Sequence, residues 1–389
     1  MAAVNRVYLD NAATSFPKPD SVYDAVDRYN REFGVAVGRG AYQLAIDVQS
    51  AVDRCRKRTA ELLGAESIER IVFTFNGTDS LNLALYGLLE AGDHVVTSAI
   101  EHNSMLRPLR ELKRRLGIKV DYVPADREGR IDPATVRAAV TPKTKLVAMI
   151  HASNVSGTIQ PIEDVGAIAR AAGAIFLVDA AQTAGHLPID VSRLPLDLLA
   201  CPGHKGLLGP LGTGILYIRP GLEERLHSFR QGGTGTNSED DRQPAALPEK
   251  YEAGNHNTPG LIGLEAAIEY LQRRGIEDIR RHEKELTARL LDGLADQTGV
   301  TLYGTASADD RVAVVSLNVA GFEPQVLAAL LDENFGIQCR AGLHCAPGAH
   351  KCLGTFDGGG TVRLSSGPFT TPEEIDQAVS ALQQIAAEG

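Results

Sequence analysis

Short apolar runs alternate along this chain with longer segments in which apolar residues recur every three or four positions. The short runs have the length of buried strands, and the longer segments have the spacing of helices. In the first part of the chain the strand-like runs cover residues 71–75, 95–98, 119–123, 146–150, 174–178, 196–200 and 214–218. Because strands that alternate with helices build helix-covered parallel sheets, the pattern predicts an α/β fold with a mostly parallel sheet.

The pattern changes in the last third of the chain. Residues 231–258 are rich in glycine and polar residues, and a loop of this length inside a compact domain is usually functional. Beyond it we expect helices over residues 260–297, 324–333 and 372–387 and strands over 312–319, 336–339 and 362–364. This order predicts a large domain, residues 16–259, and a smaller α+β domain formed by residues 1–15 and 260–389.

Composition and charge narrow the class of protein. The 389 residues are 43% hydrophobic and 23% charged, which is ordinary for a globular protein. A net charge of −10 argues against a nucleic-acid or anionic-membrane partner, and no apolar run approaches the ~18 residues that cross a bilayer. Five cysteines are too few for a disulfide framework, and the start of the chain lacks a secretory signal pattern. We therefore expect a cytoplasmic enzyme-sized protein.

Ionisable residues follow two of the predicted strands that are neighbours in sequence. Asp179 and Gln182 come after strand 174–178, and Lys205 follows strand 196–200 in the segment PGHKG. Burying an unpaired charge is costly, and ligands of open α/β sheets bind at strand ends. An acid suits a cationic ring nitrogen and a lysine suits an aldehyde, so the pair fits pyridoxal phosphate. Taken alone, Asp179 is better interpreted as a turn cap and Lys205 as a solvated side chain; the two together, with the motifs elsewhere in the chain, favour the cofactor site.

A second candidate site follows strand 71–75, where the segment NGTDS leads into a predicted helix. A strand, a turn of small residues and a helix place free backbone N–H groups and a helix dipole where a phosphate can bind. Gly77 permits close approach of the backbone, and Thr78 adds a hydroxyl donor. The P-loop pattern is absent. The alternative interpretation is an ordinary capped helix.

The segment QCRAGLHCAPGAHKCLGT concentrates sulfur and imidazole near the C-terminus. It contains Cys339, His344, Cys345, His350 and Cys352. The cysteine spacings lack the tight pairs usual in structural zinc sites, so we expect no metal. Cys345 lies in a Gly/Pro-rich stretch directly after His344, with Arg340 and Lys351 nearby. Exposure and basic neighbours favour the nucleophilic thiolate there, whereas Cys339 is interpreted as the end of a strand.

Assembled in order, these motifs resemble the cysteine desulfurases of the class V aminotransferase family. The resemblance extends nearly from end to end and rests on YLDNAATS, NGTDSLN, EHNS, SNVSG, VDAAQ, PGHKG, EAGNHNT, RAGLHCAP and GTVRLSSGPF. It implies the aspartate-aminotransferase fold (fold type I), with a mostly parallel seven-stranded sheet in the large domain, and pyridoxal phosphate as cofactor. Three positions depart from the usual pattern, namely Tyr42, Pro202 and the pair Asn255–His256.

The resemblance also implies a role for each matched residue. The cofactor-binding set is Gly77, Thr78, Asp79, His102, Asn154, Asp179, Gln182, His204, Lys205 and Asn255; the substrate-binding set is Asn154, Arg340 and Arg363; the catalytic set is Lys205, Cys345 and His102. Lys205 would bond to the cofactor's aldehyde, and Asp179 would pair with its ring nitrogen. A bidentate guanidinium such as that of Arg363 suits the substrate's α-carboxylate.

The implied reaction converts L-cysteine into L-alanine and leaves the sulfur on Cys345 as a persulfide. The resemblance further implies a homodimer with active sites at the interface and leaves room for a sulfur-acceptor protein. The alternatives are a selenocysteine lyase or another Cβ–S or Cβ–Se lyase, in which Cys345 is dispensable, and a class V aminotransferase. A non-catalytic scaffold that carries zinc or sulfur is disfavoured by the intact set Asp179, Lys205 and Arg363.

Overall fold

The computed structural model describes residues 6–38, 40–236 and 239–388 of the chain. Residues 1–5 and 389, which the sequence assigns to the small domain, lie outside the described part. So do residue 39 and residues 237–238, the latter within the segment 231–258 that is expected to be a loop.

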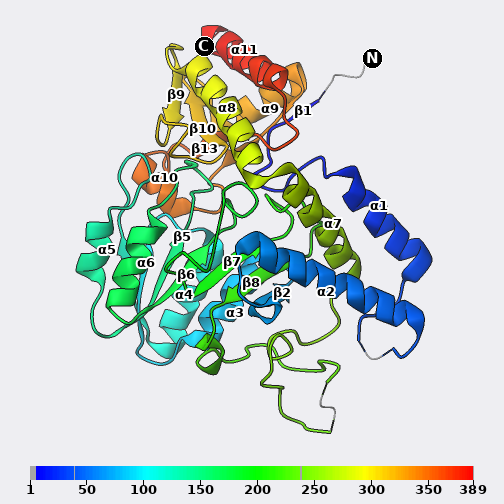
Figure 1. The fold of residues 1–389 in the computed structure, drawn as a ribbon. Coiled ribbons are helices and arrows are strands. Elements are labelled where there is room, and N and C mark those ends of the chain that lie inside the picture. The colour runs from blue at the N-terminus through cyan, green and yellow to red at the C-terminus, as the bar shows by residue number, and fades with distance from the viewer. Residues whose placement is uncertain (1–5, 39, 237–238, 389) are drawn as a thin grey trace.

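A seven-stranded sheet forms the centre of the molecule (Figure 1). Its strands are β2 (Ile71–Thr74), β3 (His94–Ser98), β4 (Lys119–Val123), β5 (Thr144–Ile150), β6 (Ile175–Asp179), β7 (Leu198–Pro202) and β8 (Gly214–Ile218). They lie in the order β2-β8-β7-β6-β5-β3-β4, and only β8 is antiparallel to its neighbours. The predicted α/β fold with a mostly parallel sheet is therefore confirmed.

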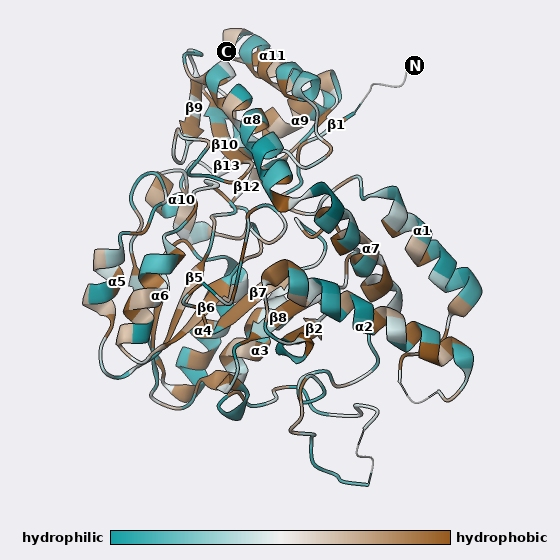
Figure 2. Ribbon diagram, in the orientation of Figure 1, coloured by the Kyte–Doolittle hydropathy of each residue, from teal (hydrophilic) through white to brown (hydrophobic). Residues whose placement is uncertain are grey.

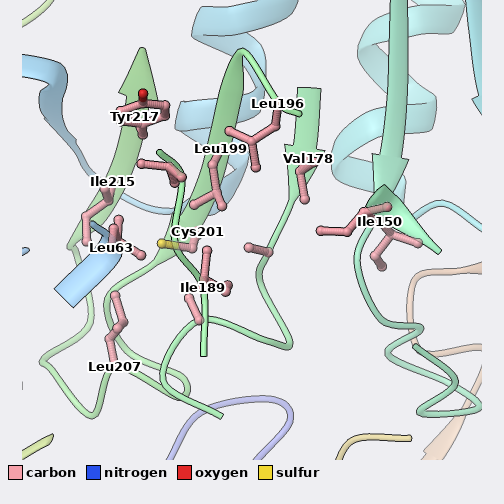
Figure 3. Packing of buried hydrophobic residues seen from close by; sticks show 14 of the residues in the cluster. Leu63, Ile150, Val178, Ile189, Leu196, Leu199, Cys201, Leu207, Ile215 and Tyr217 are labelled. Atoms are coloured by element: carbon pink, nitrogen blue, oxygen red, sulfur yellow. The ribbon is translucent and has the colours of Figure 1, made fainter. Parts of the chain in front are cut away.

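Helices cover both faces of this sheet. They are α2 (Gln43–Leu63), α3 (Gly77–Leu88), α4 (Asn103–Leu116), α5 (Pro133–Ala139), α6 (Ile162–Ala171) and α7 (Thr258–Arg274), and α1 (Asp20–Arg28) packs against α7. Successive strand residues alternate between two cores: Leu199 packs with residues of α2, α6 and α7, whereas Leu198 packs with residues of α3 and α4. Figure 3 shows the first of these cores, where Val178, Leu199 and Cys201 point toward the same layer.

Hydropathy follows this layering. In Figure 2 the strands of the large sheet are mostly apolar, and the helices show apolar and polar stripes along their length. Strands buried on both faces need continuous apolar runs, which is why the sequence shows runs instead of alternation. Across the described residues, no helix is long and apolar enough to cross a membrane.

The C-terminal part of the chain builds a smaller α+β unit, drawn at the top of Figure 1. It contains β9 (Val300–Tyr303), β10 (Val314–Val319), β12 (Arg340–Gly342) and β13 (Thr361–Ser365) in an antiparallel sheet of order β12-β13-β10-β9. β1 (Val7–Tyr8) pairs in parallel with β11 (Ile337–Gln338), and the helices are α8 (Ile276–Leu294), α9 (Pro324–Phe335), α10 (Pro347–Leu353) and α11 (Pro372–Glu388). The domain boundaries at residues 15/16 and 259/260 stay a prediction.

Two features of the small unit differ from the sequence-based expectation. The helical stretch expected over residues 260–297 is divided into α7 and α8 at Gly275, whose φ of 84° is left-handed. The cysteine-bearing segment, expected to be a loop, contains α10. Pro347 opens this helix and Gly354 ends it in a left-handed conformation. Proline at the first turn and glycine after the last turn are helix boundaries as well as loop signals.

Candidate active site

A cavity of about 190 Å³ lies at the carboxyl ends of β5, β6 and β7 and at the start of α3. Its lining residues are Asn76, Gly77, Thr78, Leu81, His102, Ser104, Ile150, Asn154, Asp179, Ala181, Gln182, Pro202, His204 and Lys205. Parallel strands end at one edge of their sheet, so residues distant in sequence meet there. The cavity thus brings together Gly77, Thr78, His102, Asn154, Asp179, Gln182, His204 and Lys205 from the predicted set.

One end of the cavity is the N-terminus of α3. The Asn76 side chain caps this helix by accepting a hydrogen bond from the Asp79 N–H at 2.9 Å. The first N–H groups of a helix have no partner within it, so those of Gly77 and Thr78 are available to an anion. Glycine is favoured at position 77 because a Cβ atom there would lie 3.1 Å from Cδ of Pro202, which is a tight contact. Pro202, one of the departures from the family pattern, therefore closes the floor beneath the anion-binding end.

The Asp79 carboxylate does not line the cavity. It accepts a hydrogen bond from the Phe75 N–H at 3.0 Å and lies 3.5 Å from a guanidinium nitrogen of Arg230. Its predicted role in cofactor binding has no support from this placement. Asp79 instead reinforces the helix N-terminus, where a negative charge is favourable.

A chain of hydrogen bonds joins the anion-binding end to His102. The Thr78 hydroxyl lies 2.8 Å from the Ser104 hydroxyl, which lies 2.8 Å from Nδ1 of His102. Burial, with a smaller contribution from Lys205, lowers the pKa of His102 to about 4. The His102 imidazole, which lines the cavity, is therefore neutral at physiological pH. Ser104 has no role in the sequence-based set, although it lies within the quoted motif EHNS.

His204 adds an unused nitrogen to the same site. Its Nδ1 atom is buried without a hydrogen-bond partner among the described residues. Burial lowers its pKa to about 4, and the Lys205 and Lys18 charges act in the same direction. Its backbone carbonyl accepts from the Lys18 ammonium at 2.9 Å, so the main chain of this turn is fixed.

Asp179 and Lys205 form the chemically distinctive part of the cavity. Asp179 is only 3% exposed, and its carboxylate accepts from the Ala181 N–H at 2.9 Å. Burial raises its pKa, whereas the Ala181 N–H and the Lys205 charge act the other way. Burial lowers the pKa of the Lys205 amine to about 8, and Asp179 opposes that shift. The nearby Gln182 amide donates to the Ala12 carbonyl at 3.0 Å.

The predicted carboxylate-binding residues are held by Asp10, which the sequence analysis left without a role. One Asp10 oxygen accepts from Arg363 at 2.7 Å, and the other accepts from Arg340 at 3.2 Å. Arg363 is 2% exposed and also donates to the Asn154 carbonyl at 3.1 Å. Asp10 follows β1 and is placed beside these arginines by the β1–β11 pairing and by its own bridge to Ser365 at the end of β13. Its place in the motif DNAATS is the one sequence signal that could have identified it.

Cys345 lies on an exposed turn between β12 and α10. His344 and Cys345 have φ angles of 47° and 58°, a left-handed conformation that is costly for residues with a Cβ atom. The other cysteines are covered to a greater extent: Cys55 and Cys201 are buried, and Cys339 and Cys352 are half-buried. Burial raises the pKa of the Cys339 thiol to about 12. Cys345 is thus the accessible thiol of the described residues.

The two histidines of this segment have threonine partners. His344 Nε2 lies 3.1 Å from the Thr361 carbonyl, and His350 Nδ1 lies 2.8 Å from the Thr355 hydroxyl. Within residues 6–38, 40–236 and 239–388, no group of three or more His, Cys, Asp or Glu is arranged to hold a metal ion.

Asn255 lies outside the cavity that contains Lys205. It lines a separate surface cavity of about 700 Å³ together with Glu252, His256 and residues of α2. His256, the second residue of the departing pair, contacts Glu252 with 3.3 Å between Nε2 and Oε2. Glu252 in turn forms a buried two-point ion pair with Arg56 at 2.7 and 2.8 Å. Within one chain, Asn255 is therefore not among the residues that line the Lys205 cavity.

The residues of the cavity fit pyridoxal phosphate. The α3 N-terminus and the unpartnered His204 Nδ1 suit a phosphate. Asp179 suits a ring nitrogen, and the Lys205 amine, partly neutral near pH 8, suits an aldehyde. The unpartnered Asn154 Oδ1 is a further polar atom that a ligand can satisfy.

Comparisons with known proteins agree with this fit. A family model described as aminotransferase class-V matches residues 7–378. The chain is 39% identical to a probable cysteine desulfurase of Methanothermobacter thermautotrophicus, over 99% of this chain and 96% of that protein. It is 34% identical to a cysteine desulfurase of Pectobacterium atrosepticum, over 97% and 92% of the two chains.

Solved structures give the same result. The apo structure of a cysteine desulfurase from Thermococcus onnurineus NA1 superposes with a TM-score of 0.93 and 37% identity, and the match covers 99% of this chain and 95% of that chain. The cysteine desulfurase CsdA of Escherichia coli, solved with an S-sulfonic acid, gives a TM-score of 0.88 and 30% identity, with 98% and 95% covered.

Proposed function

Because this chain belongs to the class V aminotransferase family, and within it to the cysteine desulfurases, we propose that it converts L-cysteine into L-alanine with pyridoxal phosphate and transfers the sulfur to Cys345. The observation that carries the proposal is the single cavity in which Asp179, Lys205 and the N-terminus of α3 meet. Cys345, the accessible thiol, lies on a turn that is hydrogen-bonded to the cavity residue Asn154.

Each end of the cavity has a part in holding the cofactor. Gly77, Thr78 and His204 would hold its phosphate, Asp179 its ring nitrogen and Lys205 its aldehyde carbon. Once bound, the cofactor supplies an electron sink that makes the substrate's Cα proton acidic. The neutral His102 ring would stack on the cofactor ring.

Lys205 is the proposed base. Its amine would take the Cα proton of the substrate, and a pKa of about 8 leaves part of this amine neutral at physiological pH. Arg363 provides the charge for the substrate's α-carboxylate. Asp10 accepts a hydrogen bond from this guanidinium, so the orientation of Arg363 is set before the substrate binds.

Cys345 is the proposed sulfur acceptor. Its thiolate attacks the substrate's sulfur, so an S–S bond forms while the Cβ–S bond breaks. The electron pair of the broken bond stays with the carbon skeleton and takes up a proton at Cβ, and alanine is released. Cys345 keeps the sulfur as a persulfide, and a thiol of an acceptor removes it later. The exposure of Cys345 supports transfer to an acceptor protein.

A homodimer is part of the proposal. Asn255 does not line the Lys205 cavity of its own chain, and large apolar side chains are exposed at the start of α2. Among these are Tyr42 (54% exposed), Leu44 (41%) and Ile46 (49%). Exposed apolar groups of this kind are typical of an interface. A second copy would cover them and could bring Asn255 to the partner's phosphate end. The cytoplasmic location predicted from the sequence remains a proposal.

Two measurements test the proposal: the amino acid that the reaction releases, and the lysine to which borohydride fixes the cofactor. The protein incubated with pyridoxal phosphate and L-cysteine should release alanine in the presence of a reductant. Borohydride reduction followed by peptide mapping should place the pyridoxyl group on Lys205. Lys205→Ala should abolish both results. A label on another lysine would refute the site, and release of alanine from selenocysteine alone would favour the lyase alternative.

A further inference from the structure

The backbone carbonyl of His204 accepts more hydrogen bonds than the two lone pairs of its oxygen can serve well. The Ser15 N–H and the Thr14 hydroxyl each donate to it at 3.1 Å, and the Ser15 hydroxyl lies at 3.2 Å. The Lys18 ammonium donates to the same oxygen at 2.9 Å. Because Lys18 is both the closest and the charged donor, it makes the strongest of these contacts. Lys18 thus holds the turn that leads into Lys205.

Lys18 carries a positive charge that no carboxylate neutralises. Besides the His204 carbonyl, its ammonium donates to the Ser15 hydroxyl at 2.7 Å, and no ion pair forms with it among the described residues. Burial lowers the pKa of this amine to about 8, and no neighbouring charge opposes the shift. The amine is therefore still largely protonated at neutral pH. A half-buried cation without a counter-charge is unfavourable in the free protein, so an anion bound nearby would stabilise it.

The end of the cavity that suits a phosphate is short of positive charge. Its histidine rings are neutral, because burial lowers the pKa of each to about 4. The Arg230 guanidinium lies 3.5 Å from the Asp79 carboxylate and is thus already paired. Two charges act on His204, those of Lys205 and Lys18, and the Lys205 amine is assigned to the aldehyde. Lys18 is therefore the unpaired cation that a phosphate at this end would meet.

We propose that Lys18 is a positioning residue of the phosphate end: its ammonium fixes His204 and supplies the positive charge that a phosphate monoester requires there. Lys18 does not line the cavity, so it acts through the His204 turn and through its field, without touching the ligand. It favours a phosphorylated aldehyde over the same aldehyde without phosphate. This inference rests on the proposed function, because it takes pyridoxal phosphate as the group bound to Lys205. It also gives a role to the segment FPKP, which follows the motif YLDNAATS.

The proposal is tested by the affinities of the cofactor-free protein for pyridoxal phosphate and for pyridoxal, measured from the absorbance of the bound aldehyde. Both aldehydes can bond to Lys205 and only the first carries a phosphate, so the ratio of the two dissociation constants isolates the contribution of the phosphate. Lys18→Gln keeps an N–H donor for the His204 carbonyl and removes the charge. It should reduce that ratio roughly tenfold, the order expected for one fixed charge at a partly buried site. The affinity for pyridoxal should change little, and Lys18→Arg should keep most of the ratio.

Arg274→Met is the matched control. Arg274 also donates to a backbone carbonyl, that of Pro368 at 2.7 Å, and to a hydroxyl, that of Tyr270 at 3.0 Å, but it does not line the cavity. This variant should leave both dissociation constants unchanged. If Lys18→Gln does not fold, the wild type is compared with Lys18→Arg as pH rises through 8. The lysine loses its charge in that range and the arginine does not, so the ratio should fall further in the wild type.

An unchanged ratio in Lys18→Gln overturns the proposal. So does an equal loss of affinity for both aldehydes, because Lys18 would then act on the Lys205 turn alone, and so does a similar fall of the ratio in Arg274→Met. Failure to release alanine from cysteine would contradict the desulfurase reaction and leave these affinities as expected.

If neither aldehyde bonds to Lys205, the proposed function fails, and calorimetric titration with inorganic phosphate tests Lys18 by itself. Lys18→Gln should then bind inorganic phosphate roughly tenfold more weakly than the wild type, and equal affinities would overturn the role of Lys18.

Discussion

At the scale of single residues, the site depends on side chains whose ionisation is changed by burial. Asp179 and Lys205 are opposite charges near one another at strand ends, and burial shifts both toward their neutral forms. The histidines of the cavity are neutral for the same reason. Such shifts are typical of catalytic sites, where a group has to exchange protons near the working pH.

The shifted pKa of Lys205 predicts how stability depends on pH in the cofactor-free protein. Its pKa is about 8 in the folded chain against an ordinary value of 10.5. Between these values the folded protein has released a proton that the unfolded chain still holds, so stability rises with pH in this window. Lys205→Met lacks this contribution. Thermal unfolding from pH 7 to 10.5 should therefore show the wild type gaining stability relative to Lys205→Met as pH rises; a constant difference would contradict the shift.

At the scale of elements, parallel strands decide which residues meet. Asp179, Lys205 and Thr78 could be predicted as site residues because each follows a strand, and strand ends of one sheet share an edge. Asp10 and Ser104 could not, since their roles depend on pairings between distant segments: β1 with β11, and the start of α4 with the start of α3. The strands of the large sheet were predictable from apolar runs. β9 was missed because its residues are mostly half-exposed and show no continuous apolar run.

A buried ion pair ties the segment that carries Asn255 to the large domain. Arg56 of α2 and Glu252 are each 6% exposed, and Glu252 also accepts from the Phe73 N–H of β2 at 2.6 Å. Removing one member of such a pair costs about 3–5 kcal/mol, because the other charge stays buried. Glu252→Gln should therefore lower the free energy of unfolding by that order in urea titrations. Arg31→Ala, which removes an exposed pair with Asp27, should cost less than about 1 kcal/mol.

Equal losses in the two variants would show that the Arg56–Glu252 pair has no special role. A large loss in the free energy of unfolding that occurs only in Glu252→Gln would mean that the segment carrying Asn255 unfolds together with the sheet. The same measurement at several protein concentrations shows whether the segment also contributes to assembly.

At the scale of the whole molecule, the account requires two copies. Asn255 does not line the Lys205 cavity of its own chain, so under the proposed shared site a single chain would lack this contribution to the phosphate end. Light scattering with size-exclusion chromatography should give twice the mass of the 41.5 kDa chain. Mixing Lys205→Ala with Asn255→Ala subunits should restore part of the activity, because one site in the mixed dimer would have both residues. A fully active monomer would rule out the shared site.

The most direct test of the central claim is the mass of Cys345 after turnover. Wild-type protein loaded with pyridoxal phosphate should be given L-cysteine without reductant, digested and analysed by mass spectrometry. The account predicts one added sulfur atom on Cys345, release of about one alanine per site, and neither event in Cys345→Ser, since a hydroxyl is a poor nucleophile toward sulfur. Added sulfur on Cys339 or Cys352, or undiminished alanine release by Cys345→Ser, would contradict it.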